Sequence, residues 1–480
     1  MCRNQILVIL SVITAFALYS CGKPEHDAPE QDTRKLTLST DNVYVEWNGG
    51  SFDLKVKANF EYRIDIQVEW IEETTSDNSS HTFNVALNQS VDSRSAVIKV
   101  IDKTDRYYYK TLTVNQGANP SPVTKLAMVD KDATASTKAL YANLWEIAKK
   151  GSMFGHHDDL WYGRYWYNEP GGSDTKAVCG DYPAVLSVDF GPIMDNRFKD
   201  KENDYRRRVI LEARERGEVI MACCHLNNPQ TGKDSWDNSR NDVVKNILTE
   251  GSVVRKTYME WLDRLADFAL DLKDSQGEQI PVILRIYHEH TQNWSWWGTS
   301  CCTAQEFVAL WQMTVKYLRD IRQVHTFIYA ISPQMDAVYS DAKGRILSRW
   351  AGDDYVDFFG MDCYHGTNYN AFSSNLEALH NVSIEKMKPC GVTETGLESF
   401  TTSDYWTKHI LNPMNGKRIS MVVMWRNKYV GSNESDKHYF SVYPGHPSEE
   451  DFKTYYNDDK SIFSSDLPDM YTMPENYEVH

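Results

Sequence analysis

Eight short apolar runs alternate with amphipathic stretches beyond Val123, and this alternation restricts the fold more than any other feature of the chain. The helical stretches include Asp204 to Arg216, Val253 to Asp271 and Thr303 to Arg322, the last opening with a Thr303-x-x-Glu306 capping box. The apolar runs occupy residues 151–156, 183–190, 218–225, 281–289, 325–333, 356–364, 388–395 and 419–426. Strand–helix repetition of this kind predicts a (β/α)8 TIM barrel of the α/β class over residues 124–480. A doubly wound open sheet is the alternative, but no Gly-rich phosphate loop follows the first run.

Residues 34–118 alternate apolar and polar side chains with the period of a β-strand. Asn48-Gly49-Gly50 lies between two of the strands as a hairpin turn. The predicted strands are Leu36–Leu38, Val43–Val45, Phe52–Val56, Tyr62–Ile66, Val97–Ile101 and Leu112–Val114. This pattern predicts a small all-β, immunoglobulin-like antiparallel sandwich, which a linker at 119–123 joins to the barrel.

The end of this segment, Thr113-Val-Asn-Gln-Gly117, together with the Gly-Gly turn, resembles the BACON type of immunoglobulin-like module. Such modules occur beside bacterial glycan-degrading domains, so the resemblance implies either a glycan-binding role or a spacer role. We expect a spacer, because no cluster of aromatic residues stands out in the segment.

The first residues resemble a bacterial lipoprotein signal. Arg3 precedes an apolar run from Ile6 to Ala17, which is too short to span a bilayer, and Cys21 follows. The resemblance implies a signal peptide over 1–20, lipid attachment at Cys21 and a polar tether over 21–33, whereas the alternative is an ordinary secretory signal. We therefore expect the protein in the bacterial cell envelope, with the lipid in the outer membrane, on its surface or its periplasmic face, as the only membrane contact.

The composition is acidic and rich in aromatic residues. The chain has 51 Lys plus Arg against 67 Asp plus Glu, a net charge of −16, which argues against a nucleic-acid partner. Its 14 Trp and 28 Tyr exceed what a core usually requires, which favours an aromatic surface or cleft. No Cys-x-x-Cys spacing occurs, so we expect no structural zinc site and no metal or other cofactor.

Polar residues gather where the predicted barrel strands end, which is where barrels carry their chemistry. These ends include His156-His157-Asp158-Asp159, His225-Leu-Asn227, Tyr287-His288-Glu289, Asp362-Cys-Tyr364-His365, Glu394 and Trp425-Arg426-Asn427. Glu289 and Glu394 follow the fourth and seventh strands, which lie across the barrel mouth, so the two carboxylates could flank a glycosidic bond. The alternative is that each carboxylate forms a structural pair with a barrel arginine such as Arg285.

An aromatic loop, Trp294-Ser-Trp296-Trp297-Gly298, comes just after Glu289. Indole rings stack well on the CH faces of sugars, so the loop predicts a saccharide cleft. The alternative is that the tryptophans pack against the barrel rim, which we expect for one of the three but not for all.

Residues 152–429 resemble glycoside hydrolase family 26, which is dominated by endo-acting β-mannanases. The motifs that carry the resemblance are Phe154-Gly-His156, His225-Leu-Asn-Asn-Pro229, His288-Glu289-x4-Trp294-x-Trp-Trp-Gly298, Gly360-x-Asp362-x-Tyr364, Thr393-Glu394-x-Gly396 and Trp425-Arg426-Asn427. The resemblance implies a retaining mechanism with Glu289 as acid/base and Glu394 as nucleophile. It also implies substrate-binding roles for His156, Trp161, His225, His288, Trp294, Tyr364, Trp425 and Arg426. His157 departs from a common family form with Gln, which leaves the contacts of that first loop open.

The resemblance implies hydrolysis of β-1,4-mannosidic bonds in mannan, galactomannan or glucomannan. We expect the protein to be a monomer. A metal-dependent barrel hydrolase is one alternative, motivated by histidines near strand ends at 156, 157, 225, 288, 290 and 365. A lipoprotein that captures glycan without turnover is another. Loss of activity in chelator would favour the first alternative, and tight mannan binding without release of reducing ends would favour the second.

Overall fold

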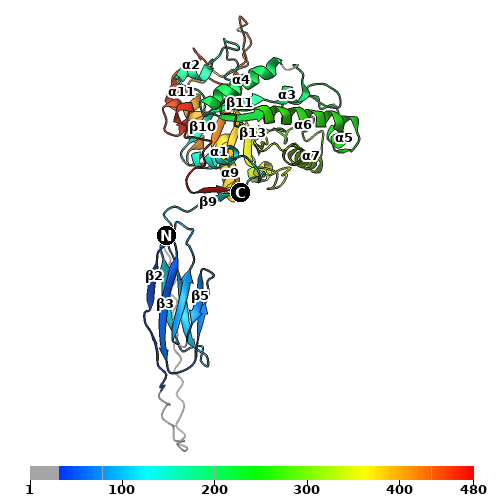
Figure 1. The fold of residues 1–480 in the computed structure, drawn as a ribbon. Helices are drawn as coiled ribbons and strands as arrows, with labels where there is room; N and C mark the ends of the chain where they lie inside the picture. Colours follow the sequence, from blue (N-terminus) through cyan, green and yellow to red (C-terminus); the bar gives the residue numbers. More distant parts are fainter. Residues whose placement is uncertain (1–31, 78, 199–200, 434) are drawn as a thin grey trace, which may run out of the picture. The chain divides into compact units, whose positions relative to one another are not determined.

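The computed structural model describes residues 32–77, 79–198, 201–433 and 435–480. The chain divides into two compact units between Pro122 and Val123 (Figure 1). The predicted signal peptide and Cys21 lie outside the described residues. Among the helices of the described ranges, none combines the length and the apolar character that a membrane crossing needs.

The N-terminal unit is a sandwich of two four-stranded sheets. One sheet has the order β1 (Leu36–Leu38), β3 (Gly50–Ala58), β6 (Ser80–Val85) and β5 (Ile71–Ser76). The other has the order β2 (Asn42–Val45), β8 (Tyr109–Gln116), β7 (Arg94–Asp102) and β4 (Tyr62–Ile66). The pairs are antiparallel except for β2 and β8, which run parallel. Alternate side chains such as Leu54, Phe83, Ile98 and Leu112 form its buried core, which confirms the predicted sandwich.

The second unit contains a closed barrel of eight parallel strands. They are β10 (Ser152–His157), β11 (Val185–Asp189), β12 (Val219–Cys223), β13 (Val282–Arg285), β14 (Phe327–Ile331), β15 (Phe358–Cys363), β16 (Cys390–Thr395) and β17 (Met421–Met424). Strand β10 pairs with both β11 and β17, which closes the barrel, while β18 (Ser461–Ile462) adds to the start of β10. The predicted barrel is confirmed and the open sheet is excluded. One boundary was wrong: the run 281–289 ends as a strand at Arg285 and then turns.

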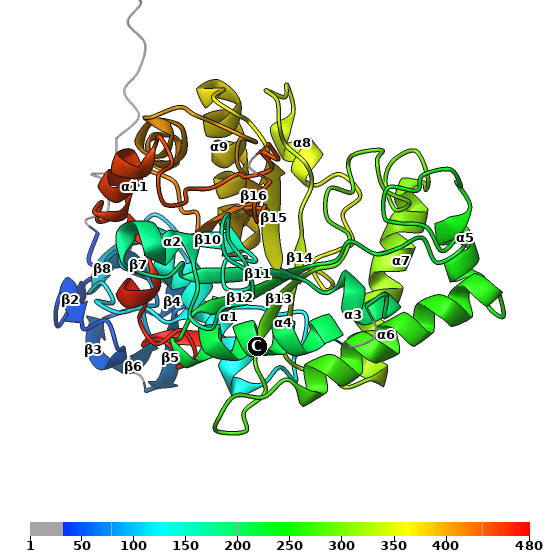
Figure 2. The same cartoon turned by 90° about the horizontal axis from the view of Figure 1, so that it is seen from above.

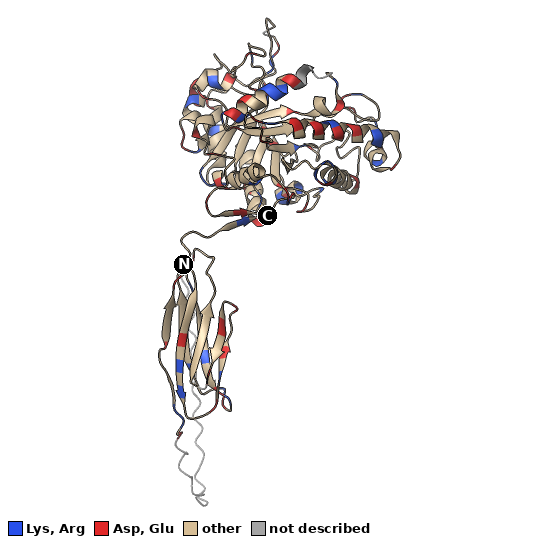
Figure 3. Ribbon diagram, in the orientation of Figure 1, with Lys and Arg blue, Asp and Glu red and all other residues tan. Residues whose placement is uncertain are grey.

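Helices cover the outside of the barrel, as Figure 2 shows. They are α2 (Asp174–Cys179), α3 (Gly191–Asp195), α4 (Lys201–Glu215), α5 (Val243–Leu248), α6 (Val253–Asp271), α7 (Ala304–Lys316), α8 (Ala342–Ile346), α9 (Tyr369–Lys386), α10 (Asn412–Met414) and α11 (Glu449–Tyr456). The predicted capping box of Thr303 and Glu306 is present at the start of α7. Charged residues lie along outer helices such as α4 and α6, whereas the barrel strands carry few (Figure 3).

Two sets of apolar residues alternate along the barrel strands. Met153, Val185, Ile283 and Val423 point into the barrel and form one core with α1 (Ala135–Ile147). The alternate residues, such as Phe154 and Leu186, contact the surrounding helices in a second core. Beside α1, the end strand β19 (Tyr477–Val479) pairs with β9 (Thr124–Leu126). Since side chains alternate between the two faces of a strand, these cores define which residues at the strand ends reach the barrel mouth.

Candidate active site

A cavity of about 650 Å³ lies at the carboxyl ends of the barrel strands. Of the residues predicted to bind substrate, Trp161, His225, Trp425 and Arg426 line it. A larger hollow of about 1200 Å³ beside α4 and the segment 467–472 contains none of the predicted residues. The cavity at the strand ends is therefore the candidate active site.

The two predicted glutamates face each other at the ends of the barrel strands, although neither is among the residues that line this cavity. Carboxylate oxygens of Glu289, Asp362 and Glu394 all lie within 4.8 Å of one another. The side chains are buried, with 9% of Glu289 and 4% of Glu394 exposed. Three carboxyl groups this close cannot all be ionised without strong repulsion, so their protonation states must differ.

An extra residue in β16 directs Glu394 into the barrel. Along β15 and β16, Gly360 pairs with Gly391 and Met361 pairs with Val392, but Asp362 pairs with Glu394. The register thus skips one residue, which is a β-bulge. Without the bulge, Glu394 would share the face of Val392 and point to the helices, because side chains two apart lie on the same face.

Arg285 holds Glu394 in its ionised form. The Arg285 guanidinium is fully buried and donates to both oxygens of Asp362, at 2.7 Å, and to Glu394 Oε1. Tyr364 donates its hydroxyl proton to Glu394 Oε2 at 2.9 Å. Burial alone would raise the pKa of Glu394, but the positive charge and hydrogen bond of Arg285 lower it to about 2. Arginine pairing, the structural alternative for the glutamates, therefore coexists with their facing arrangement and keeps Glu394 ionised.

Glu289 is held in the opposite state. Its backbone lies in the left-handed region, with φ 51°, and its N–H donates to Ser332 O at 2.8 Å. Trp294 Nε1 donates to Glu289 Oε2 at 2.5 Å. Burial, followed by the charges of Glu394 and Asp362, raises the pKa of Glu289 well above its ordinary value, although the indole hydrogen bond opposes the shift. The site therefore combines a protonated carboxylic acid with an ionised carboxylate.

The tryptophans of the aromatic loop divide between packing and the cleft. Trp296 and Trp297 are fully buried, and their indole N–H groups donate to Leu226 O and His288 O at 3.1 and 2.8 Å. Trp294 is half-buried and lies 4.6 Å, ring to ring, from Trp236. The rim-packing alternative thus holds for two of the three.

Sequence reasoning missed Trp236, which lines the cavity and is 63% exposed. Its lone position in the polar stretch Asp234-Ser-Trp-Asp-Asn238 was the available signal, since a large ring there has no neighbouring apolar run to join.

The predicted His156 lies outside the cavity lining, and its neighbour His157 takes the place at the wall. His157 follows Met153 and Gly155 on the inner face of β10 and stacks on Trp425, with ring centres 4.2 Å apart. His156 shares the outer face with Phe154, and its Nδ1 lies 2.9 Å from Asp159. Strand alternation is the physical reason for this difference.

Trp161 and Arg426 stand on one side of the cleft. The guanidinium of Arg206 lies 5.0 Å from the centre of the Trp161 ring. Arg426 donates to the hydroxyl of Tyr162 at 2.9 Å, and that hydroxyl donates to Asp158. These contacts give the side chains fixed orientations along the cavity wall.

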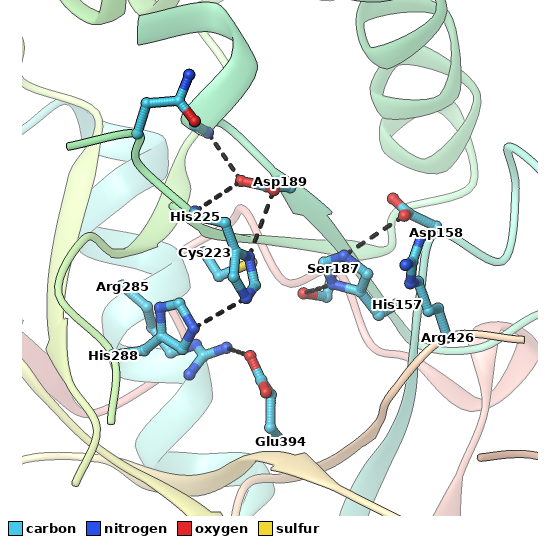
Figure 4. A network of polar contacts seen from close by, with 12 residues as sticks. His157, Asp158, Ser187, Asp189, Cys223, His225, Arg285, His288, Glu394 and Arg426 are labelled. Atoms are coloured by element: carbon cyan, nitrogen blue, oxygen red, sulfur yellow. Dashed lines mark hydrogen bonds and ion pairs between the residues drawn. The ribbon is translucent and has the colours of Figure 1, made fainter. Parts of the chain in front are cut away.

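His225 and His288 form a pair beside Glu394, with 3.2 Å between their Nε2 atoms (Figure 4). His288 is buried, and burial followed by its neighbour His225 lowers its pKa well below the ordinary value. The other histidines of the metal alternative lie apart: His290 Nε2 bonds Ser348 O and His365 Nε2 bonds His409 O. The six histidines therefore do not converge on a common centre.

A family model described as glycosyl hydrolase family 26 matches residues 129–397, more than half of the chain. The mannan endo-1,4-β-mannosidase of Bifidobacterium adolescentis is 27% identical over 378 residues, which cover 73% of this chain. That match covers only 37% of the Bifidobacterium protein's own length.

Solved structures agree with this assignment. A GH26 β-mannanase from Bacteroides ovatus is 36% identical, with a TM-score of 0.67 over 71% of this chain and 98% of that one. The catalytic domain of a GH26 endo-β-1,4-mannanase from Bacillus sp. JAMB-750 is 29% identical, with a TM-score of 0.67 over 75% of this chain and 98% of that one. The chain belongs to glycosyl hydrolase family 26.

Proposed function

We propose that the chain is a retaining β-mannanase that cleaves β-1,4-mannosidic bonds in mannan, galactomannan or glucomannan. The observation that carries the proposal is the pair of facing carboxyl groups, Glu289 protonated and Glu394 ionised, at the barrel mouth. Retaining glycosidases place such groups about 5–5.5 Å apart, whereas inverting ones need about 6.5–9.5 Å. The approach of their oxygens to within 4.8 Å supports retention. The substrate class follows from the mannanases to which the chain is similar.

In the first step, Glu394 attacks the anomeric carbon while Glu289 gives its proton to the departing glycosidic oxygen. Ionised Glu394 needs no base, because Arg285 already stabilises its charge. The product is a glycosyl ester of Glu394, and Glu289 is now ionised.

In the second step, Glu289 takes a proton from water, which attacks the anomeric carbon and releases Glu394. The indole N–H of Trp294 stabilises Glu289 while it is ionised. Two inversions at the same carbon return the original anomeric configuration.

The cleft suits an uncharged polysaccharide. Trp236, Trp425 and the His225 ring offer flat faces for sugar CH groups, and Arg426 offers a donor for hydroxyls. No sugar charge has to be neutralised, which agrees with the net charge of −16. Together these groups provide stacking and hydrogen bonding without an ionic partner.

Product analysis on purified mannan tests the proposal. We expect the parent chain to release oligosaccharides whose new reducing ends first appear in the β configuration by NMR. Glu394→Gln and Glu289→Gln should release essentially none. Glu218→Gln is a matched control. Glu218 is also a buried glutamate, but it lies directly before β12, where it pairs with Arg216.

Two outcomes would contradict the proposal. Mannan binding without release of reducing ends by the parent would favour a glycan-capturing protein. Loss of activity in chelator, restored by zinc, would favour the metal-dependent alternative.

We also propose that the protein is a lipid-anchored monomer of the cell envelope. The proposal rests on the resemblance of residues 1–21 to a lipoprotein signal and gives the N-terminal sandwich a spacer role. Cys21→Ala should move the protein from the membrane fraction to the soluble fraction, and metabolic labelling with palmitate should be lost. Unchanged membrane association of the variant would exclude the anchor, and a dimer in sedimentation analysis would exclude the monomer.

A further inference from the structure

Asp189, Cys223 and His225 meet at the floor of the cleft, and Figure 4 shows them beside Glu394 of the proposed catalytic pair. Asp189 ends β11 and pairs directly with Cys223, the last residue of β12. Cys223 follows Val219 and Met221 on the inner face of the barrel, and His225 lies two residues further on. Asp189 and His225 both line the cavity, so the cluster is reached from the cleft.

Two of the three separations between the ligand atoms match tetrahedral metal coordination, and all three atoms lie within 4.8 Å of one another. His225 Nδ1 lies 3.4 Å from Asp189 Oδ2 and 3.7 Å from Cys223 Sγ. Zinc bond lengths of about 2.0–2.1 Å to nitrogen and oxygen and about 2.3 Å to sulfur give separations of roughly 3.3 Å and 3.6 Å. A cation could therefore enter with little movement of the side chains.

The surroundings orient these ligands. Asp189 Oδ1 accepts the backbone N–H groups of Gly191 and His225, at 2.8 and 3.1 Å, which leaves Oδ2 directed at the His225 ring. The hydrogen bond from His225, with the charges of Arg206 and Arg197, outweighs burial and keeps the pKa of Asp189 well below its usual range. On the far side of the ring, His288 Nε2 can accept a hydrogen bond from the Nε2–H group of His225, at 3.2 Å. Metal-bound histidines commonly make such an outer hydrogen bond.

We propose that Asp189, Cys223 and His225 form a binding site for a thiophilic divalent cation such as Zn²⁺ or Cd²⁺, and that its occupation inhibits the enzyme. On binding, the Cys223 thiol releases its proton to solvent, and the His225 proton moves to Nε2, so that Sγ and Nδ1 donate electron pairs to the cation. Thiolate and carboxylate together neutralise its charge. The open fourth position faces the cavity.

Inhibition follows because the bound cation occupies the cleft floor and fixes His225, a predicted sugar contact. This half of the inference rests on the proposed mannanase function, whereas binding itself does not. The site is regulatory in this scheme, since neither step of the proposed hydrolysis uses a metal.

Cobalt binding to the metal-stripped full chain tests the site directly. We expect a thiolate-to-cobalt charge-transfer band in the near ultraviolet that zinc abolishes by displacement. Cys223→Ser should lose the band and should need at least ~100-fold more zinc for half-inhibition of mannan hydrolysis, since even outer-shell changes cost about 10–100-fold in affinity. Its hydrolysis without metal should match the parent.

The adjacent cysteine is the matched control. Cys224 is equally buried but packs in the core that faces the helices, so Cys224→Ser should keep both the band and the sensitivity to zinc. Cys223→Ala serves as a second variant if the serine at 223 prevents folding.

A band that persists in both Cys223 variants, or one that disappears equally in Cys224→Ser, would overturn the inference. Equal zinc sensitivity of parent and Cys223→Ser would overturn the inhibitory role. Because the cobalt band needs no substrate, failure of the mannanase proposal and failure of the metal site would be seen separately.

Discussion

Replacing Trp294 by Phe removes one hydrogen bond from the proposed acid and keeps an aromatic ring at the same place. The indole Nε1 donates to Glu289 Oε2 at 2.5 Å, and the acceptor is a buried carboxyl. Hydrogen bonds to charged groups contribute about 1.5–3 kcal/mol, and one pKa unit corresponds to about 1.36 kcal/mol. Since the bond stabilises ionised Glu289, we expect Trp294→Phe to raise the pKa of Glu289 by a further ~1–2 units.

The pH dependence of kcat/KM on a soluble manno-oligosaccharide measures this change. In the proposed mechanism Glu289 must be protonated to release the leaving group, so activity should fall as the pH rises through its pKa. The basic limb of the profile should therefore move ~1–2 pH units upward in Trp294→Phe. The acidic limb depends on Glu394 and should stay in place.

Trp296→Phe is the control, because the same substitution in the same loop removes an N–H that donates to the carbonyl of Leu226 rather than to a carboxyl. Its basic limb should match the parent. A basic limb that remains fixed or moves down in Trp294→Phe would refute the assigned role of the indole, and so would an equal shift in both variants.

Three further substitutions test the charge balance. Arg285→Met leaves Glu394 and Asp362 without their cation, so the free energy of unfolding in denaturant should fall by about 3–5 kcal/mol. The acidic limb of the kcat/KM profile should move upward from about pH 2, and an unchanged limb would contradict the pairing. Tyr364→Phe removes the 2.9 Å hydrogen bond to Glu394 and should lower kcat/KM about tenfold at pH 7 with an unchanged melting temperature. Burial raises the pKa of Asp174 from 3.8 to about 6, so its charge lowers the free energy of unfolding by about 2 kcal/mol as the pH rises from 4 to 7. In guanidinium unfolding, Asp174→Asn should no longer lose stability between pH 4 and pH 7. A loss as large as that of the parent would contradict the raised pKa of Asp174.

The barrel could be predicted from sequence because parallel strands buried on both faces appear as continuous apolar runs. The sandwich was harder, since its outer face is polar. Strand β5, Ile71-Glu-Glu-Thr-Thr-Ser76, has one apolar residue, and neither it nor β6 was predicted. Strand β6 owes its place to pairing with β3, and β5 to pairing with β6, and a local sequence pattern does not contain these pairings.

In the candidate site, the types of residue were easier to predict than their directions. Two carboxylates after apolar runs are conspicuous, and the structure brings Glu289 and Glu394 together. The choice between His156 and His157 depends on the face of β10 to which each belongs, and adjacent identical residues give no local cue. The contact between Asp189 and Cys223 depends on the register between β11 and β12, which cannot be predicted from the sequence of either strand alone.

The bulge in β16 makes catalysis depend on spacing as well as on composition. Insertion of a single codon between Thr393 and Glu394 would move the carboxylate to the place of Thr395, which pairs with Cys363 on the face toward the helices, and so away from its partner across the mouth. Such a protein would keep every acidic residue of the parent and still be inert. Among variants of this chain, the number of residues between Gly391 and the glutamate therefore predicts activity better than the presence of the glutamate does.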